Sequence, residues 1–311
     1  MERTTLNTHT QSVVIALFSL ILCLSSLQAQ EIVSFTSYDG VEFKGRLHYP
    51  SGNYQQKLVI DVPGSGPHTY LNRRKIGRSI VFNYHDYFAE QFRKDGIAYL
   101  SYNTRYTTID SFPPYYDEVD KKQFWNYTPL QKVKDLERVI SRLKKDKRFR
   151  FSQIILHGQS EGAIIATMVA RRKKVTIDAL FLSGMPADDV YSTMCWQNQG
   201  GSSMVIFRRF FDRNDDELIQ PSEYVNADPR AIRKVGGKRF QELDFNADSL
   251  LTRADFRVML KPKFQRILKA IEDNDNSWIW ENYFRVGIPW IKAHKKIAPN
   301  KERLLELDLP V

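Results

Sequence analysis

The residues best suited to chemistry are Gly158-Gln159-Ser160-Glu161-Gly162. An apolar run at residues 154–156 precedes them and a small-residue segment at 163–170 follows, which predicts a buried strand, a sharp turn and a helix. In that context the Gly-x-Ser-x-Gly pattern indicates a nucleophile elbow, because small residues on either side of the serine let strand and helix pass closely. Ser160 is therefore predicted as a nucleophile at a helix amino end, where free N–H groups favour developing negative charge. The alternative is a Gly-Ser turn without chemistry.

Two acidic loops later in the chain have the spacing of a metal site. Residues 212–223 and 244–255 each place oxygen-bearing side chains at loop positions 1, 3, 5, 9 and 12 and a large apolar residue at position 8. Hard cations such as calcium bind six to eight oxygen ligands. The spacing resembles that of EF-hand loops, and the resemblance implies as ligands Asp212, Asn214, Asp216, the Leu218 carbonyl and Glu223 in the first loop, and Asp244, Asn246, Asp248, the Leu250 carbonyl and Asp255 in the second.

The two loops resemble a pair of EF-hands, and the resemblance implies one or two bound calcium ions. It also implies that the position-8 residues, Ile219 and Leu251, join the loops through a short antiparallel bridge. Both loops depart from the pattern at position 6, where Glu217 and Ser249 replace the usual glycine. Left-handed backbone at a residue other than glycine costs roughly 1 kcal/mol, so we expect weak affinity. The alternative is a pair of solvated acidic turns that bind nothing.

The remaining elements must position Ser160. Asp39-Gly40 lies between two strand patterns, which indicates a hairpin. Further strands and helices then alternate, which predicts a mostly parallel α/β sheet with helices on both faces. The expected elements are strands at 31–38, 41–49, 58–62, 97–102 and 179–184, a helix at 79–94, and a basic amphipathic helix from Lys132 to Arg150 whose charged face is solvated.

Residues 31–190 resemble the front half of an α/β-hydrolase. The resemblance rests on Pro-Gly-Ser-Gly-Pro at 63–67, Tyr-Asn-Thr-Arg at 102–105 and the Ser160 motif, which occur in the family's order. It implies a serine hydrolase for a small-molecule ester or peptide-like acyl substrate, with Ser160 as the nucleophile. It also implies an oxyanion hole formed by the backbone N–H groups of Ser65 and Glu161. Residues 191–300 are expected to form a helical insertion or cap, which contains the EF-hand-like pair at about 203–260.

The first 29 residues are typical of a secretory signal peptide, with Arg3 in a polar start and an apolar run at 13–24. We therefore expect a secreted or periplasmic protein without a stable membrane anchor after cleavage, although a retained anchor is the alternative. Cys195 is then the single cysteine of the mature chain, so a large core rather than a disulfide must hold the fold. The net charge of +10 does not predict nucleic-acid binding, because no matching motif accompanies it.

A serine nucleophile of this kind needs a carboxylate and a histidine, which follow the serine in the chain order of this fold. Residues 301–311 resemble the start of the returning core strand, and His294 is the only histidine after Ser160. We expect His294 to lie on the surface. The sequence thus predicts a truncated hydrolase that lacks its triad acid and histidine. The alternative is a non-catalytic, exported, calcium-binding pseudo-hydrolase, and neither the substrate nor the oligomeric state follows from the sequence.

Overall fold

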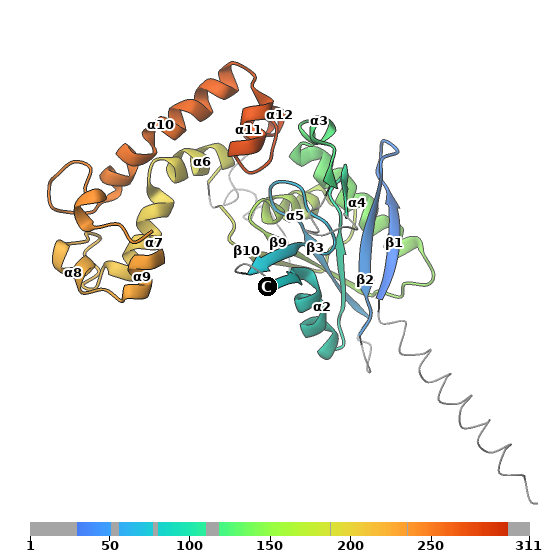
Figure 1. The fold of residues 1–311 in the computed structure, drawn as a ribbon. Coiled ribbons are helices and arrows are strands. Elements are labelled where there is room, and N and C mark those ends of the chain that lie inside the picture. The colour runs from blue at the N-terminus through green and yellow to red at the C-terminus, as the bar shows by residue number, and fades with distance from the viewer. Residues whose placement is uncertain are drawn as a thin grey trace, which may run out of the picture. The chain divides into compact units, whose positions relative to one another are not determined.

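The computed structural model describes residues 30–50, 56–76, 80–109, 118–186, 188–234 and 236–297. The predicted signal peptide at 1–29 and the predicted returning strand at 301–311 lie outside the described residues. The chain divides into two compact units (Figure 1). The first contains the described parts of Met1–Asp120 and Leu130–Met185, and the second contains those of Lys121–Pro129 and Pro186–Glu306.

The first unit is built on a six-stranded sheet with the strand order β1-β2-β6-β3-β9-β10. Its strands are β1 (Gln30–Thr36), β2 (Glu42–His48), β3 (Lys57–Val62), β6 (Ala98–Tyr102), β9 (Gln153–Gln159) and β10 (Ala179–Ser183). β1 and β2 form the predicted antiparallel hairpin, and the last four strands of that order run parallel, so the prediction of a mostly parallel sheet is confirmed. Two short antiparallel pairs join β4 (Arg73–Ile76) to β5 (Ile80–Asn83) and β7 (Thr107–Thr108) to β8 (Glu118–Val119).

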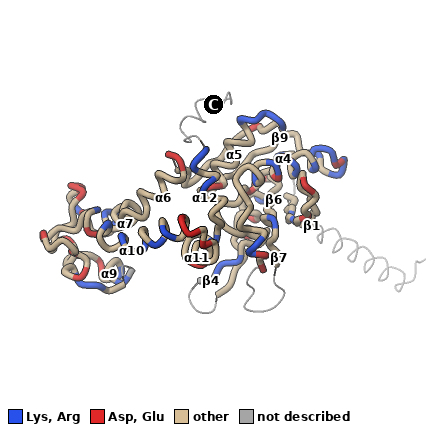
Figure 2. Tube along the Cα trace, turned by 90° about the horizontal axis from the view of Figure 1, so that it is seen from above, with Lys and Arg blue, Asp and Glu red and all other residues tan. Residues whose placement is uncertain are grey.

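Helices cover both faces of this sheet (Figure 1). Leu58 and Ile60 of β3 pack with α4 (Pro129–Lys145) and α5 (Glu161–Arg172), whereas Val59 between them packs with α2 (Tyr84–Lys94). This alternation follows from the period of two in a strand. The predicted helix at 79–94 begins later than expected, because residues 80–83 pair with β4 as a strand. Figure 2 shows the basic residues of α4 continuing into the turn before β9.

The second unit is helical. Its elements are α3 (Lys121–Phe124), α6 (Val190–Asn198), α7 (Gly201–Phe211), α8 (Pro221–Val225), α9 (Pro229–Lys234), the 3₁₀ turn η1 (Phe240–Glu242), α10 (Arg253–Glu272), α11 (Asn276–Asn282) and α12 (Ile288–His294). The expectation of a surface position for His294 is wrong: it is buried and its ring packs edge-on against Trp290. Across the described ranges, no helix is long and apolar enough to cross a membrane.

Candidate functional site

Ser160 lies between β9 and α5, at the turn that the sequence predicts. Its backbone is strained, with φ 56° and ψ −123°. Its N–H donates to the Ser183 carbonyl of the neighbouring strand β10 at 3.0 Å, and the residue is exposed. Strained backbone of this kind costs about 1–3 kcal/mol and persists only where the surrounding structure imposes it. The turn therefore holds Ser160 exposed at the carboxyl ends of the parallel strands.

The two glycines of the motif are required by space. A Cβ atom on Gly158 would lie 2.6 Å from the Ala163 Cα and from the Gly162 carbonyl oxygen. A Cβ atom on Gly162 would overlap the carbonyl oxygen of Val62, at the end of β3. Strand, helix and neighbouring strand thus meet backbone to backbone around Ser160, as the motif predicts.

The glycine-rich loop after β3 lies against this turn. A Cβ atom on Gly64 would stand 3.3 Å from the Gln159 carbonyl oxygen and 3.8 Å from the Ser160 Cβ. Among the described residues the Ser65 N–H has no acceptor, while the Ser65 carbonyl accepts a hydrogen bond from His68 Nε2 at 3.0 Å. Burial and the nearby Lys132 charge lower the pKa of His68 to about 4, so this imidazole is neutral near pH 7. Gly64 is thus packed against the Ser160 turn, and the N–H of Ser65, the next residue, is available as a donor.

An ion pair lies next to both predicted oxyanion donors. The Lys132 ammonium donates to Glu161 Oε2 at 2.8 Å and to the Gly64 carbonyl at 3.2 Å. Both charged side chains are buried, with 6% and 2% of their surfaces exposed. The prediction that Lys132 belongs to a solvated helix face is therefore wrong. The Lys132 side chain points from α4 into the protein, where the Glu161 carboxylate compensates its charge.

A second buried cluster was not predicted from the sequence. The Asp61 carboxylate of β3 is hydrogen-bonded to His157 Nδ1 at 3.0 Å, and its other oxygen lies 3.2 Å from His85 Nε2. Burial would raise the pKa of Asp61, but these two histidines outweigh burial and hold that pKa below its usual range. Ser160 Oγ makes no hydrogen bond to any described histidine, so the base that a triad requires is not placed within the described ranges.

The two acidic loops of the second unit face each other through their position-8 residues. Ile219 and Leu251 exchange backbone hydrogen bonds of 3.2 and 2.9 Å, so the expected bridge is present. Position 6 has left-handed backbone in both loops, with φ 68° at Glu217 and 63° at Ser249. In each loop the position-6 N–H donates to the position-1 aspartate, at 3.1 and 3.0 Å. The two loops therefore share one backbone conformation.

The side chains of these loops mainly bond to loop backbone. Glu223 accepts from the Arg213 and Gln220 N–H groups, and Asp255 accepts from the Phe245 and Thr252 N–H groups. Among the described residues, no group of three or more His, Cys, Asp or Glu side chains is arranged to hold a metal ion. One oxygen differs: Asp212 Oδ1 is buried without a hydrogen-bond partner. An orphaned carboxylate oxygen at loop position 1 fits a cation ligand, because a buried charged oxygen needs a partner.

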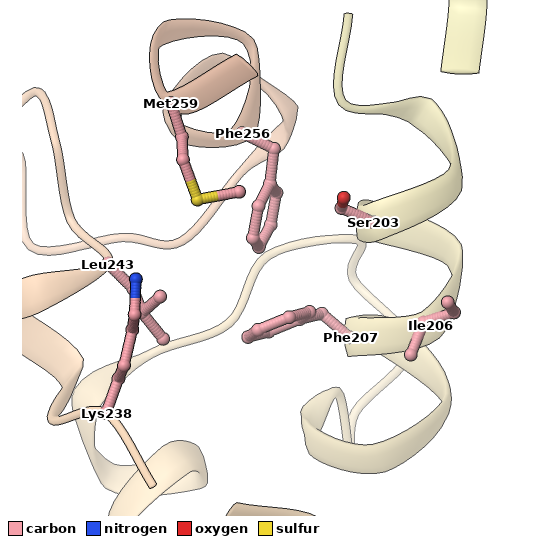
Figure 3. A pocket seen from close by; sticks show the side chains of 7 residues that line it. All are labelled: Ser203, Ile206, Phe207, Lys238, Leu243, Phe256 and Met259. Atoms are coloured by element: carbon pink, nitrogen blue, oxygen red, sulfur yellow. The ribbon is translucent and has the colours of Figure 1, made fainter. Parts of the chain in front are cut away.

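The second unit also contains an apolar pocket of about 330 Å³ between α7 and α10 (Figure 3). Phe207 and Phe256 form two of its walls, with Met259 beside Phe256 and the Lys238 side chain extended along Leu243. Its volume is at the lower end of the range of small-molecule sites. Sequence analysis did not predict this pocket, because a pocket depends on packing between segments that are distant in the chain.

No protein-family model and no curated protein matches the chain. Solved structures that it resembles include a hypothetical protein from Pseudomonas aeruginosa, at 11% identity and TM-score 0.44 over 90% of this chain and 74% of that one. A highly thermostable carboxyl esterase from Bacillus coagulans is 14% identical, with TM-score 0.38 over 60% and 53% of the two chains. An alpha-beta serine hydrolase homologue from Coxiella burnetii is 18% identical, with TM-score 0.33. That match covers 50% of this chain and 64% of the Coxiella chain. The activity of this chain does not follow from similarities this low.

Proposed function

We propose that the chain is the nucleophile-bearing part of an exported serine hydrolase of the α/β-hydrolase type, which acts on ester or peptide-like acyl bonds. The observation that carries the proposal is the strained backbone conformation of Ser160, with φ 56° at a residue that is not glycine. Ser160 is also exposed, between a parallel strand and a helix. Such strain has no structural purpose in an ordinary strand-to-helix turn, whereas it raises a serine hydroxyl towards a substrate. The proposal that the protein is exported rests on residues 1–29 alone, which have the pattern of a signal peptide.

In this proposal Ser160 Oγ attacks the carbonyl carbon of the substrate, and the leaving group departs as the acyl–serine ester forms. Negative charge develops on the carbonyl oxygen during the attack. The N–H groups of Ser65 and Glu161 receive it, and the amino end of α5 adds a favourable dipole. A base must also take the serine proton, and no histidine among the described residues is hydrogen-bonded to Ser160, so the geometry supports nucleophile and oxyanion donors only.

Labelling with a fluorophosphonate probe tests the proposal. We expect one covalent label per chain, which the Ser160→Ala variant abolishes and the Ser152→Ala variant retains, because Ser152 is an exposed serine before the same strand. Equal labelling of all three chains would contradict a nucleophilic Ser160. Absence of labelling in every chain would contradict a reactive Ser160 in this chain, a result that a missing triad base and a non-catalytic calcium-binding pseudo-hydrolase would both produce.

We further infer that the loops at 212–223 and 244–255 bind one or two calcium ions. The orphaned Asp212 oxygen and the Ile219–Leu251 bridge support this proposal. Asp212, Asn214, Asp216, the Leu218 carbonyl and Glu223 would hold one ion, and Asp244, Asn246, Asp248, the Leu250 carbonyl and Asp255 the other. Bound calcium would neutralise the loop carboxylates and stabilise the helices on either side.

Calorimetric titration and thermal unfolding test calcium binding. A calcium concentration 100-fold above Kd should add about 2.7 kcal/mol to the free energy of unfolding. The Asp212→Asn and Asp244→Asn variants should weaken this effect, whereas Glu272→Gln, at an exposed carboxylate on α10 outside both loops, should not. Solvated turns that bind nothing would give no heat and no shift in the melting temperature.

A further inference from the structure

The Gly64–Ser65 peptide group connects Lys132 to the predicted oxyanion hole. The Gly64 carbonyl and the Ser65 N–H belong to one planar peptide unit, and they point in opposite directions across it. The Lys132 ammonium holds the carbonyl end at 3.2 Å. Fixing one end of a rigid plane fixes the direction of the other end, which is the N–H expected to receive the oxyanion.

The charge of Lys132 has a second consequence at the other donor. Glu161 supplies the second predicted N–H, and its carboxylate lies buried beside Lys132 at 2.8 Å. Without the ammonium, a buried carboxylate would remain next to the position where negative charge develops in the substrate. Lys132 cancels this charge. Its hydrogen bond also polarises the Gly64–Ser65 peptide, which strengthens the N–H at the far end as a donor.

We propose that Lys132 is a positioning residue for the oxyanion hole, which orients the Ser65 N–H through the Gly64 carbonyl and neutralises Glu161 beside Ser160. The proposal rests on the proposed serine hydrolase function. Lys132 reaches both segments from α4, an element that contributes no other residue to the predicted chemistry. It acts through the Gly64 carbonyl and the Glu161 carboxylate, the two groups to which its ammonium donates.

Three variants separate positioning from folding. Lys132→Met keeps the aliphatic stem but removes the ammonium that neutralises the buried Glu161 carboxylate, so it should lower both stability and reactivity. Adding Glu161→Gln removes the uncompensated charge and should restore the melting temperature, but it leaves the Gly64 carbonyl untethered. Lys145→Met, at an exposed position of the same helix, is the matched control and should change neither property.

The experiment measures the rate at which an activated aryl ester acylates Ser160 in each chain, by mass spectrometry, together with the melting temperature. We expect the double variant to melt like the unmodified chain and to acylate about 100-fold more slowly, which is the lower end of the loss that follows removal of an oxyanion donor. Acylation of the double variant at the unmodified rate would overturn the positioning role while leaving the serine hydrolase function intact. If the unmodified chain is not acylated, the proposed function fails, and this proposal fails with it.

Discussion

Arg105 has the largest fully buried side chain among the described residues, and it shows how single side chains stabilise the first unit. Its guanidinium donates to both oxygens of Asp135, each at 2.5 Å, and to Asp39 at 2.6 Å. Burial would raise the pKa of Asp39, but the hydrogen bond and charge of Arg105 outweigh it and lower that pKa to about 2. The Tyr-Asn-Thr-Arg segment thus ends in an ion pair that joins the hairpin turn to α4.

Replacing Arg105 with methionine should therefore lower the free energy of unfolding by about 3–5 kcal/mol, because the buried Asp135 carboxylate would lose both hydrogen bonds from the guanidinium and its compensating charge. Arg142→Met removes an exposed ion pair with Asp146 and should cost less than about 1 kcal/mol. Urea unfolding of the two variants measures both values. If both variants lost a similar free energy of unfolding, the buried Arg105–Asp135 pair would contribute no more than the exposed pair, which would contradict this prediction.

Gly162 of the elbow and Gly40 of the hairpin turn separate the effect of steric overlap from the effect of backbone conformation. Gly162→Ala should destabilise the first unit by about 1–3 kcal/mol and reduce labelling of Ser160, because the new methyl group overlaps the Val62 carbonyl. Gly40→Ala meets no atom within 4 Å but has φ 87°, so it should cost about 1 kcal/mol and leave labelling unchanged. Unchanged labelling of Gly162→Ala would show that the backbones can separate without disturbing the serine.

Sequence analysis found residues whose role is set by near neighbours and missed those whose partners are distant. Ser160 and its glycines occupy one short segment, so their spacing carries the prediction. Lys132 and Glu161 are 29 residues apart, and Asp61 and His157 are 96 apart. The spacing of residues along α4 groups Lys132 with the other basic residues of that helix. It could not indicate that the Glu161 carboxylate, from α5, lies beside the Lys132 ammonium.

At the scale of elements, the two loops carry strain that a substitution can remove. Ser249 has φ 63° and its side chain forms no hydrogen bond to described residues. We expect Ser249→Gly to stabilise the second unit by roughly 1 kcal/mol, because glycine adopts this backbone without steric cost. Thermal unfolding in calcium measures the gain. Ser222→Gly, within helix α8, should instead destabilise, and a loss in both variants would contradict strain at Ser249.

Element boundaries were predicted best where a local signal marks them. Asp39-Gly40 places the hairpin, and the apolar run before Ser160 places β9. Residues 80–83 follow a helical pattern yet pair with β4, because tertiary pairing overrides a weak period in a short segment. Pro289 occupies the first turn of α12, where proline is tolerated. His294 is buried at the end of that helix.

For the molecule as a whole, acid should act on the first unit through buried histidines. Burial lowers the pKa of His48 to about 3 and that of His68 to about 4, with nearby cations adding to the effect. Both groups bind protons more readily when unfolded, so their contribution is complete above pH 6.5 and is lost as pH falls towards the folded pKa values. Each should reduce stability by about 1.4 kcal/mol per pH unit in that range.

Chemical unfolding between pH 7 and about 4.5 measures this dependence. His68→Asn should make the slope shallower by roughly one proton, while His294→Asn, outside the first unit, should leave the slope of the first unit unchanged. Stability that does not change with pH across this window would contradict neutral, buried histidines in the first unit.

The central claim is that the fold exposes Ser160 as a nucleophile, and the site of acylation tests it most directly. The chain is exposed briefly to an activated aryl ester, digested, and its acyl group located by tandem mass spectrometry. The account predicts one acyl group on Ser160, in the peptide that joins β9 to α5. An acyl group distributed over surface lysines and tyrosines, with Ser160 unmodified, would contradict it.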